Sequence, residues 1–518
     1  MRSKELSRRD FLRLVGIGGG AALLNACAPR VLTETVFPPT STAGMNTAAT
    51  SGAVDVEIAL KAVEGEVQIL PGNATRVWRY QAEVLSGPAD AVQVIPGSYL
   101  GPIFNVKRGQ TIRIYFTNEL RESSIVHWHG LHVPVEADGH PRLAIESGET
   151  YIYEFTVLDR AGTYWYHPHP HGRTGPQAYA GLAGLLLISD DEESGLGLPS
   201  GDYDMPIVIQ DRRFDNNNQL VYGGNGMMDQ MMGFLGDQIL INGQIDFSLS
   251  VETRPYRLRL LNGSNSRIYK LAWDDGTPLT VLATDGGLLE KPVEREYITL
   301  APAQRVELWV DFSKDEIGSE RNLVNLPFDA YGGGSEYQVL PVKVEKDVTV
   351  SAPLPETLSN ITWQDADKAV NRRSPRDFTL AMGGGMQWSL NGRTFEMNDV
   401  AKDEIVKLGD LEVWEFKNQA NGGMGMGMMN ETLPHPMHVH GLQYQVIERE
   451  VDSSGRSAWE TLKDGHVDEG WHDTVLVMPG ERVKILLKFE DFTGLYLYHC
   501  HNLEHEDMGM MRNYRVDA

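Results

Sequence analysis

The sequence predicts an all-β protein made of three similar β-sandwich domains. Short apolar segments separated by Gly, Pro and Asp turns dominate the chain, and few long helical patterns compete with them. A strand-like run at 111–118 recurs at 257–262 and at 411–418, and each copy ends in asparagine. Because this period is about 150 residues, the size of one domain, we expect three domains of one plan.

The run at 111–118 justifies the assignment to strands. Ile112, Ile114 and Phe116 alternate with polar residues, so in an extended chain they share one face. Such a strand has one side in a hydrophobic core. Each repeat is therefore predicted to be an antiparallel sandwich rather than a helical unit.

A second repeat relates the first and third domains. Gly148 and Gly480 are each followed, at equal spacing, by another glycine and then by a histidine, His167 or His499. The middle third of the chain has no such copy. The domains that we predict cover residues 53–195, 202–348 and 356–518.

Composition excludes several classes of protein. The 518 residues are 41% apolar and 23% charged, which is an ordinary globular mixture and excludes disorder or a fibrous fold. The net charge of −25 would repel nucleic acid and attract cations, so we expect no nucleic-acid partner. With only two cysteines, Cys27 and Cys500, the chain cannot form a disulfide framework.

The first 27 residues resemble an export signal. Arg8 and Arg9 precede an uncharged apolar run that is too short for a bilayer, which needs about 20 residues, and this pattern resembles a twin-arginine (Tat) signal. Residues 24–27 resemble a bacterial lipobox, in which Cys27 becomes lipidated; ordinary cleavage after Ala28 is the alternative. We expect an exported protein, periplasmic or on the extracytoplasmic face of the membrane, with residues 28–52 as a flexible tether.

Histidines gather in four clusters that predict metal binding. All 15 histidines lie outside residues 172–434, so the middle domain contains none. In each His-x-His pair the two imidazoles project from the same side of a strand, because successive side chains alternate. Imidazole suits zinc, copper, iron and nickel, so the pairs alone leave the metal open. The pairs are His127 and His129, His167 and His169, His438 and His440, and His499 and His501.

Cys500 narrows the choice of metal. A thiolate with His435, His505 and a weak axial Met510 is the ligand set of a blue-copper electron-transfer site. Because neighbouring side chains alternate, Cys500 faces one metal while the histidines on either side of it face others. Electrons can then cross between the two sites through covalent bonds.

With these clusters the sequence resembles the bacterial three-domain multicopper oxidases, which include laccase-like enzymes and copper-efflux oxidases. The resemblance covers residues 54–518. It implies three cupredoxin-like Greek-key domains, of which the middle one is a copper-free spacer. It also implies four copper ions and coupling of one-electron oxidation of a reductant to four-electron reduction of O2 to water.

The resemblance also implies a role for each ligand position. His435, Cys500, His505 and Met510 match the type 1 copper ligands, His127 and His438 match the type 2 ligands, and His129, His167, His169, His440, His499 and His501 match the ligands of the type 3 pair.

Two acids match the family's proton donors, Glu506 and Asp138. Reduction of O2 consumes protons in a buried site, so carboxylates that relay them are chemically required. The alternative is that either acid only orients a copper ligand or its water.

The sequence leaves the reductant open between phenols, aromatic amines, bilirubin-like pigments, Cu(I) and Fe(II). A Met-Gly segment just before His435 offers soft thioethers that favour Cu(I), although a flexible apolar flap is the alternative. A further methionine cluster at 227–232 fits a short packed helix. A non-catalytic copper-binding or scaffold protein is the alternative function, but here every ligand position is filled. The methionines of the Met-Gly segment are Met424, Met426, Met428 and Met429.

Overall fold

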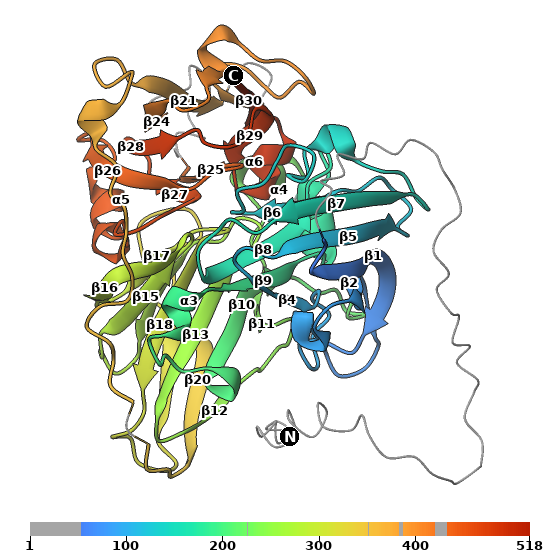
Figure 1. Cartoon of the computed structure of the whole chain (residues 1–518). Coiled ribbons are helices and arrows are strands. Elements are labelled where there is room, and N and C mark those ends of the chain that lie inside the picture. Colours follow the sequence, from blue (N-terminus) through green and yellow to red (C-terminus); the bar gives the residue numbers. More distant parts are fainter. Residues whose placement is uncertain (1–52, 225, 351, 383–386, 420–432) are drawn as a thin grey trace.

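The computed structural model describes residues 53–224, 226–350, 352–382, 387–419 and 433–518. These residues form six β-sheets, which pair into three sandwiches that follow one another along the chain (Figure 1). The three sandwiches that the repeat predicts are therefore present. Among the described helices, none has the length and apolar character needed to span a membrane.

The first sandwich joins a sheet of order β2-β1-β5-β7 to a sheet of order β3-β4-β9-β8-β6. Its strands are β1 (Val56–Val67), β2 (Thr75–Ser86), β3 (Val92–Gln93), β4 (Ile103–Lys107), β5 (Thr111–Asn118), β6 (Val126–His129), β7 (Thr150–Thr156), β8 (Gly162–Pro168) and β9 (Gly184–Ser189).

The middle sandwich joins a sheet of order β11-β10-β13-β18-β15-β16 to a sheet of order β12-β20-β19-β14-β17. Its strands are β10 (Asp204–Arg212), β11 (Gln238–Ile241), β12 (Leu249–Glu252), β13 (Pro255–Asn262), β14 (Tyr269–Trp273), β15 (Leu279–Thr284), β16 (Gly287–Arg295), β17 (Ile298–Leu300), β18 (Arg305–Asp311), β19 (Glu320–Asn325) and β20 (Tyr337–Lys346).

The third sandwich joins a sheet of order β22-β21-β24-β28-β26 to a sheet of order β23-β30-β29-β25-β27. Its strands are β21 (Arg376–Met382), β22 (Trp388–Leu390), β23 (Ile405–Lys407), β24 (Leu411–Asn418), β25 (His435–Val439), β26 (Tyr444–Val451), β27 (Thr474–Val477), β28 (Glu481–Lys488), β29 (Gly494–Cys500) and β30 (Met511–Asp517).

Helices are short and lie in the connections between strands. The α-helices are α2 (Thr174–Ala180), α3 (Asp191–Ser194), α4 (Met227–Met232), α5 (Arg456–Glu460) and α6 (Leu503–Asp507). The 3-10 turns are η1 (Ala89–Ala91), η2 (Pro141–Leu143), η3 (Gly201–Tyr203), η4 (Ala366–Lys368), η5 (Lys402–Glu404) and η6 (Lys463–Gly465).

The sheets are not purely antiparallel, which corrects the expectation from the sequence. Each one contains a single parallel pair: β1 with β5, β4 with β9, β10 with β13, β12 with β20, β21 with β24, and β23 with β30. Parallel neighbours need a crossover connection, and here the chain makes it by passing to the other sheet of the sandwich. The repetition of this feature shows that the three sandwiches share one topology.

A buried asparagine ends the equivalent strand of each sandwich: Asn118 in β5, Asn262 in β13 and Asn418 in β24. Each side-chain amide donates to two backbone carbonyls and so fixes the loop that follows the strand. The acceptors are Glu122 and Ile145 for the first, Arg267 and Leu300 for the second, and Leu433 and Val477 for the third, at 2.7–3.1 Å.

The backbone carbonyl of the same asparagine accepts an N–H from a residue in a left-handed conformation. That residue is Gly148 (φ +84°) in the first sandwich and Gly480 (φ +74°) in the third. In the middle sandwich it is Ala303 (φ +72°), a conformation that costs a residue with a Cβ about 1–2 kcal/mol. The turn is thus retained even where glycine is not.

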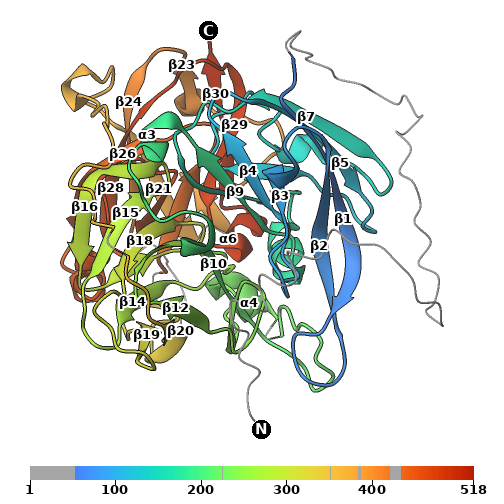
Figure 2. The same ribbon diagram turned by 60° about the horizontal axis from the view of Figure 1, so that its bottom comes forward.

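The predicted core face of the strand at 111–118 is confirmed. Ile112, Ile114 and Phe116 of β5 are at most 1% exposed, while the residues between them are partly exposed. Figures 1 and 2 show the first sandwich in blue to cyan, the middle one in green to yellow and the third in orange to red, each meeting the other two. The histidine-bearing strands of the first and third sandwiches face each other across one of these interfaces.

Candidate copper centres

Strand pairing brings the histidine pairs together within each sandwich. In the first, β6 pairs with β8 so that His127 lies opposite His167. In the third, β25 pairs with β29 so that His438 lies opposite His499. Each sandwich therefore presents four imidazoles at one edge, and the two edges meet.

Eight buried imidazoles converge at this junction, as the sequence predicts. They form one pair and two groups of three. The nitrogens within 3.5 Å of each other are Nε2 of His127 and His438 (3.3 Å); Nε2 of His167 with Nδ1 of His129 (3.4 Å) and with Nε2 of His501 (3.5 Å); and Nε2 of His499 with Nε2 of His169 (3.3 Å) and of His440 (3.0 Å).

The outward nitrogens show that this cluster fits metal ions. Nδ1–H of His127, His438 and His167 donates to a backbone carbonyl at 2.6, 2.7 and 2.9 Å. A neutral imidazole carries one hydrogen, so the inward Nε2 atoms of these residues present lone pairs. Lone pairs that converge at such distances fit metal ions bound between them.

Burial also keeps the imidazoles neutral, which is the form that binds metal. It lowers the pKa of seven of the eight well below the ordinary value, with neighbouring histidines adding to the effect in most cases. These residues are His127, His129, His167, His169, His438, His440 and His501.

A separate group contains Cys500, His435 and His505, all from the third sandwich. Sγ of Cys500 lies 3.4 Å from Nδ1 of His435 and 3.7 Å from Nδ1 of His505, and those two nitrogens are 3.2 Å apart. Burial raises the pKa of the Cys500 thiol, so a thiolate here needs a cation. Met510 is fully buried beside it, and its carbonyl accepts the N–H of Cys500 at 3.0 Å.

The alternation predicted around Cys500 is confirmed. Its sulfur joins this mononuclear group, while His499 and His501 belong to the cluster of eight. The two centres are therefore linked through the backbone of β29 and the residue after it.

A helix of the middle sandwich covers the mononuclear group. The predicted short helix at 227–232 is α4, and the carbonyl of its Met231 accepts from Nε2–H of His505 at 3.1 Å and from Nε1–H of Trp388 at 3.1 Å. The ring of Trp388 lies 4.4 Å from that of His505 and 4.9 Å from that of His435. This cover was not predicted from the sequence, because it depends on contacts between domains.

Both predicted acids lie against the cluster of eight. Oδ2 of Asp138 accepts from Nδ1–H of His440 at 2.9 Å, and Glu506 lies with Oε2 3.2 Å from Nδ1 of His499 and Oε1 3.6 Å from Nε2 of His169. Burial raises the pKa of Asp138 to about 8. Burial also opposes ionisation of Glu506, but its contacts with His169 and His499, including the hydrogen bond from Nδ1–H of His499, favour the carboxylate and lower the pKa of this acid.

One carboxylate at the cluster escaped the sequence analysis. Oδ1 of Asp473 lies 2.9 Å from Nε2 of His129, and its backbone carbonyl is the acceptor for His438. Asp473 directly precedes β27, the neighbour of the histidine strand β25. That adjacency becomes visible only once the sheet is known.

Several predicted features lie outside the described residues. These are the export signal, Cys27, the tether and the Met-Gly segment with Met424, Met426, Met428 and Met429.

Comparison with known proteins agrees with this geometry. Residues 76–193 and 369–518 match multicopper oxidase family models. The chain is 33% identical over 457 residues to a multicopper oxidase of Staphylococcus aureus, covering 88% of each. Its fold matches the crystal structure of the McoA multicopper oxidase of Aquifex aeolicus at 34% identity and a TM-score of 0.76, over 91% of this chain and 100% of that one.

A second solved structure is the Campylobacter jejuni multicopper oxidase described as a metallo-oxidase, at 27% identity and a TM-score of 0.71, over 89% of this chain and 91% of that one. These likenesses confirm the all-β fold of three cupredoxin-like domains. The clusters of buried imidazoles have the make-up of a type 1 and a trinuclear copper site. The chain therefore belongs to the multicopper oxidases, oxidoreductases that couple oxidation of a reducing substrate to reduction of O2.

Proposed function

We propose an assignment of the individual ligands to four copper ions. The grouping of nitrogens by distance supports it, since it separates the cluster into one pair and two groups of three. His435, Cys500 and His505 with axial Met510 hold type 1 copper; His127 and His438 hold type 2; His129, His167 and His501 hold one type 3 ion, and His169, His440 and His499 hold the other.

The bound copper ions supply one-electron redox centres and the site of O2 reduction. The protein supplies the route between them, because Cys500 is covalently joined to His499 and His501. With copper bound, the backbone from Cys500 to His499 and to His501 would connect the Cys500 group with both groups of three imidazoles.

Asp138 and Glu506 have different roles in proton delivery. Asp138, with a pKa raised to about 8 by burial, holds a proton near neutral pH and lies beside His440. Glu506 is held as a carboxylate between His169 and His499, where it can accept a proton and pass it inward. The pair can relay protons from two sides of the cluster.

The cover over the type 1 group favours Cu(I) as the reductant over bulky phenols. His505 is fully buried, and its Nε2–H is already bonded to Met231, so the edge of this imidazole is not free to contact an aromatic donor. A small cation needs less room, and the net charge of −25 attracts it. The thioethers of the Met-Gly segment, which directly precedes His435, offer soft ligands for it.

The ratio of kcat/KM for Cu(I) to that for a simple phenol tests this proposal. Changing Met424, Met426, Met428 and Met429 together to Leu keeps the apolar volume and removes the thioethers. We expect the Cu(I) value to fall at least severalfold, with little change for phenol and no change of either value in the control Met397→Leu. Equal losses for both donors, or an unchanged Cu(I) rate, would contradict the proposal.

We also propose export through the Tat system and lipid anchoring at Cys27, supported by Arg8-Arg9 and the lipobox-like residues 24–27. Cell fractionation tests both steps. Arg8→Lys with Arg9→Lys should retain the protein in the cytoplasm, and Cys27→Ser should release the exported protein from the membrane. A Cys27→Ser protein that stays in the membrane fraction contradicts the anchor.

A further inference from the structure

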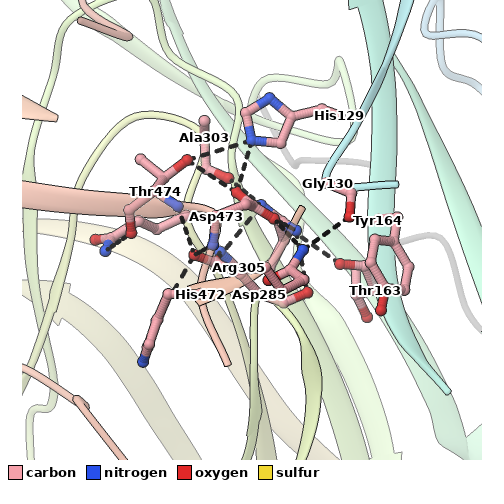
Figure 3. Close-up of polar contacts among 12 residues, drawn as sticks. His129, Gly130, Thr163, Tyr164, Asp285, Ala303, Arg305, His472, Asp473 and Thr474 are labelled. Atoms are coloured by element: carbon pink, nitrogen blue, oxygen red, sulfur yellow. Dashed lines mark hydrogen bonds and ion pairs between the residues drawn. The ribbon is translucent and has the colours of Figure 1, made fainter. Parts of the chain in front are cut away.

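A buried arginine of the middle domain joins all three domains beside the copper cluster. Arg305, in β18, is fully buried. Its Nε–H donates to the carbonyl of Thr163 in the first domain at 2.9 Å, and its Nη groups donate to the carbonyls of Ala303 and Asp285 in the middle domain. The same guanidinium reaches Asp473 of the third domain, as Figure 3 shows.

The contact with Asp473 is a two-point ion pair. Nη1 of Arg305 lies 2.9 Å from Oδ1 and Nη2 lies 2.5 Å from Oδ2. Parallel donation by a planar guanidinium fixes the plane of a carboxylate as well as its charge. Thr474 and Gln443 donate to the same carboxylate at 2.9 and 3.0 Å, so its orientation is determined from several sides.

The oriented carboxylate acts on one copper ligand that differs from the others. Seven of the eight imidazoles turn Nε2 inward, whereas His129 turns Nδ1 inward, toward His167. The outward Nε2–H of His129 donates to Oδ1 of Asp473 at 2.9 Å. A neutral imidazole with its hydrogen on Nε2 must present a lone pair at Nδ1.

The chain next to His129 leaves room for this arrangement. Gly130 has φ +89°, and a Cβ there would lie 2.5 Å from Oδ2 of Asp473 and 2.8 Å from Nη2 of Arg305. Only glycine allows the ion pair to approach the ligand strand so closely. The absence of a side chain at Gly130 therefore makes room for the ion pair between Arg305 and Asp473.

We propose that Arg305 is a positioning residue of the trinuclear copper site. Its guanidinium holds the Asp473 carboxylate through the two-point ion pair, and this carboxylate directs Nδ1 of His129 to copper. The middle domain, expected to be only a spacer, thus takes part in building the site. This inference rests on the proposed role of His129 as a type 3 ligand.

Copper content and spectroscopy of Arg305→Lys and Arg305→Met test the proposal. Lysine keeps the positive charge but cannot form the two-point ion pair with Asp473. Because changes to groups that orient a ligand cost roughly 10–100-fold in metal affinity or activity, we expect weaker binding of type 3 copper by that factor. Type 3 copper that loses its partner should become visible by EPR, while the blue type 1 band keeps its intensity.

The matched control is Arg257→Lys. Arg257 lies in the neighbouring strand β13, is equally buried, and pairs with Glu307 at 2.6 Å and with Glu193, away from the histidines. The Arg257→Lys variant should be less stable to unfolding than the wild type but should have the same copper content. Equal copper loss in Arg257→Lys, or full type 3 copper in both Arg305 variants, would overturn the proposal.

Asp473→Asn gives a second route if Arg305→Met fails to fold. The double variant Arg305→Lys with Asp473→Asn should lose no more type 3 copper than either single change, because both act on one contact. Additive losses would refute the coupling. A wild-type protein without a blue band or an EPR-silent pair would instead refute the ligand assignment on which the inference rests.

Discussion

The two copper centres differ in how many domains build them. The ligands proposed for type 1 copper all come from the third sandwich, between His435 and Met510, and the carbonyl of Met231 in the middle domain bonds to one of them. The proposed trinuclear site uses an edge from each of two sandwiches and an arginine, Arg305, from the remaining one. The first centre is therefore a property of one folded domain, and the second is a property of domain docking.

Helix α6 connects the mononuclear group with the cluster of eight imidazoles. It carries His505 of the mononuclear group and Glu506 of the cluster on adjacent positions. The next residue, Asp507, accepts the N–H groups of Thr174 and Gly175 in α2 of the first domain, both at 2.9 Å. Loosening this interface should disturb the cluster before it disturbs the type 1 group.

The largest expected effect is on the mononuclear group alone. Cys500→Ser should abolish the blue band and oxidase activity, because it removes both the thiolate and the covalent route to the cluster. The fold and the remaining three copper ions should persist, as copper analysis and circular dichroism can show. A serine variant that is blue and active would refute the assignment.

Gly139→Ala should disturb the cluster of eight imidazoles and leave the type 1 group intact. Gly139 has φ +86°, and a Cβ there would lie 2.1 Å from the carbonyl oxygen of Val126 and 2.7 Å from Cα of His127. The clash should displace His127 and Asp138, so type 2 copper should be lost while the blue band remains. EPR and copper analysis measure both.

The control is Gly148→Ala, whose φ of +84° brings the same strain of about 1–2 kcal/mol but no atom within 4 Å. This variant should keep all its copper. If it loses type 2 copper to the same extent, backbone strain rather than the contact with His127 is responsible.

Glu506→Gln should separate the two centres kinetically. Loss of a proton relay typically slows a reaction at least about 10²-fold, and only O2 reduction at the cluster consumes protons. Stopped-flow traces should therefore show nearly normal reduction of type 1 copper and slow reoxidation by O2. Equal slowing of both half-reactions would place Glu506 outside the relay.

The smallest effect is expected for an ion pair within the third domain. Partial burial of Asp468 opposes its ionisation, but Arg449 donates two hydrogen bonds to its carboxylate, at 2.7 and 3.0 Å, and lowers its pKa. Asp468→Asn should cost about 1 kcal/mol of unfolding free energy near neutral pH, since the pair is partly solvent-exposed. Copper content should not change.

The pH dependence of this cost has a defined sign. A lowered pKa stabilises the folded protein above the unfolded-state pKa of about 3.9, and the gain disappears as the pH falls through the folded-state value. Thermal unfolding of the wild type and Asp468→Asn should therefore converge in acid. A difference that persists at low pH would mean that packing, not charge, holds this pair.

Local sequence patterns predicted the copper ligands well, but they did not predict the residues that hold those ligands in place. The His-x-His pairs could be recognised because a period of two places both imidazoles on one side of any strand. Asp473, Arg305 and Met231 could not, because each acts on a residue far away in the chain and leaves no local pattern.

The asparagine turn at the end of β5, β13 and β24 is shared by all three domains, although they differ in their metal ligands. The middle domain has no histidine, yet it has the same asparagine and a left-handed residue bound to its carbonyl. In the middle copy even a strained Ala303 was accepted at that position. The architecture of a domain therefore does not depend on its metal ligands, so a domain without histidines can keep the same fold and support the ligands of its neighbours.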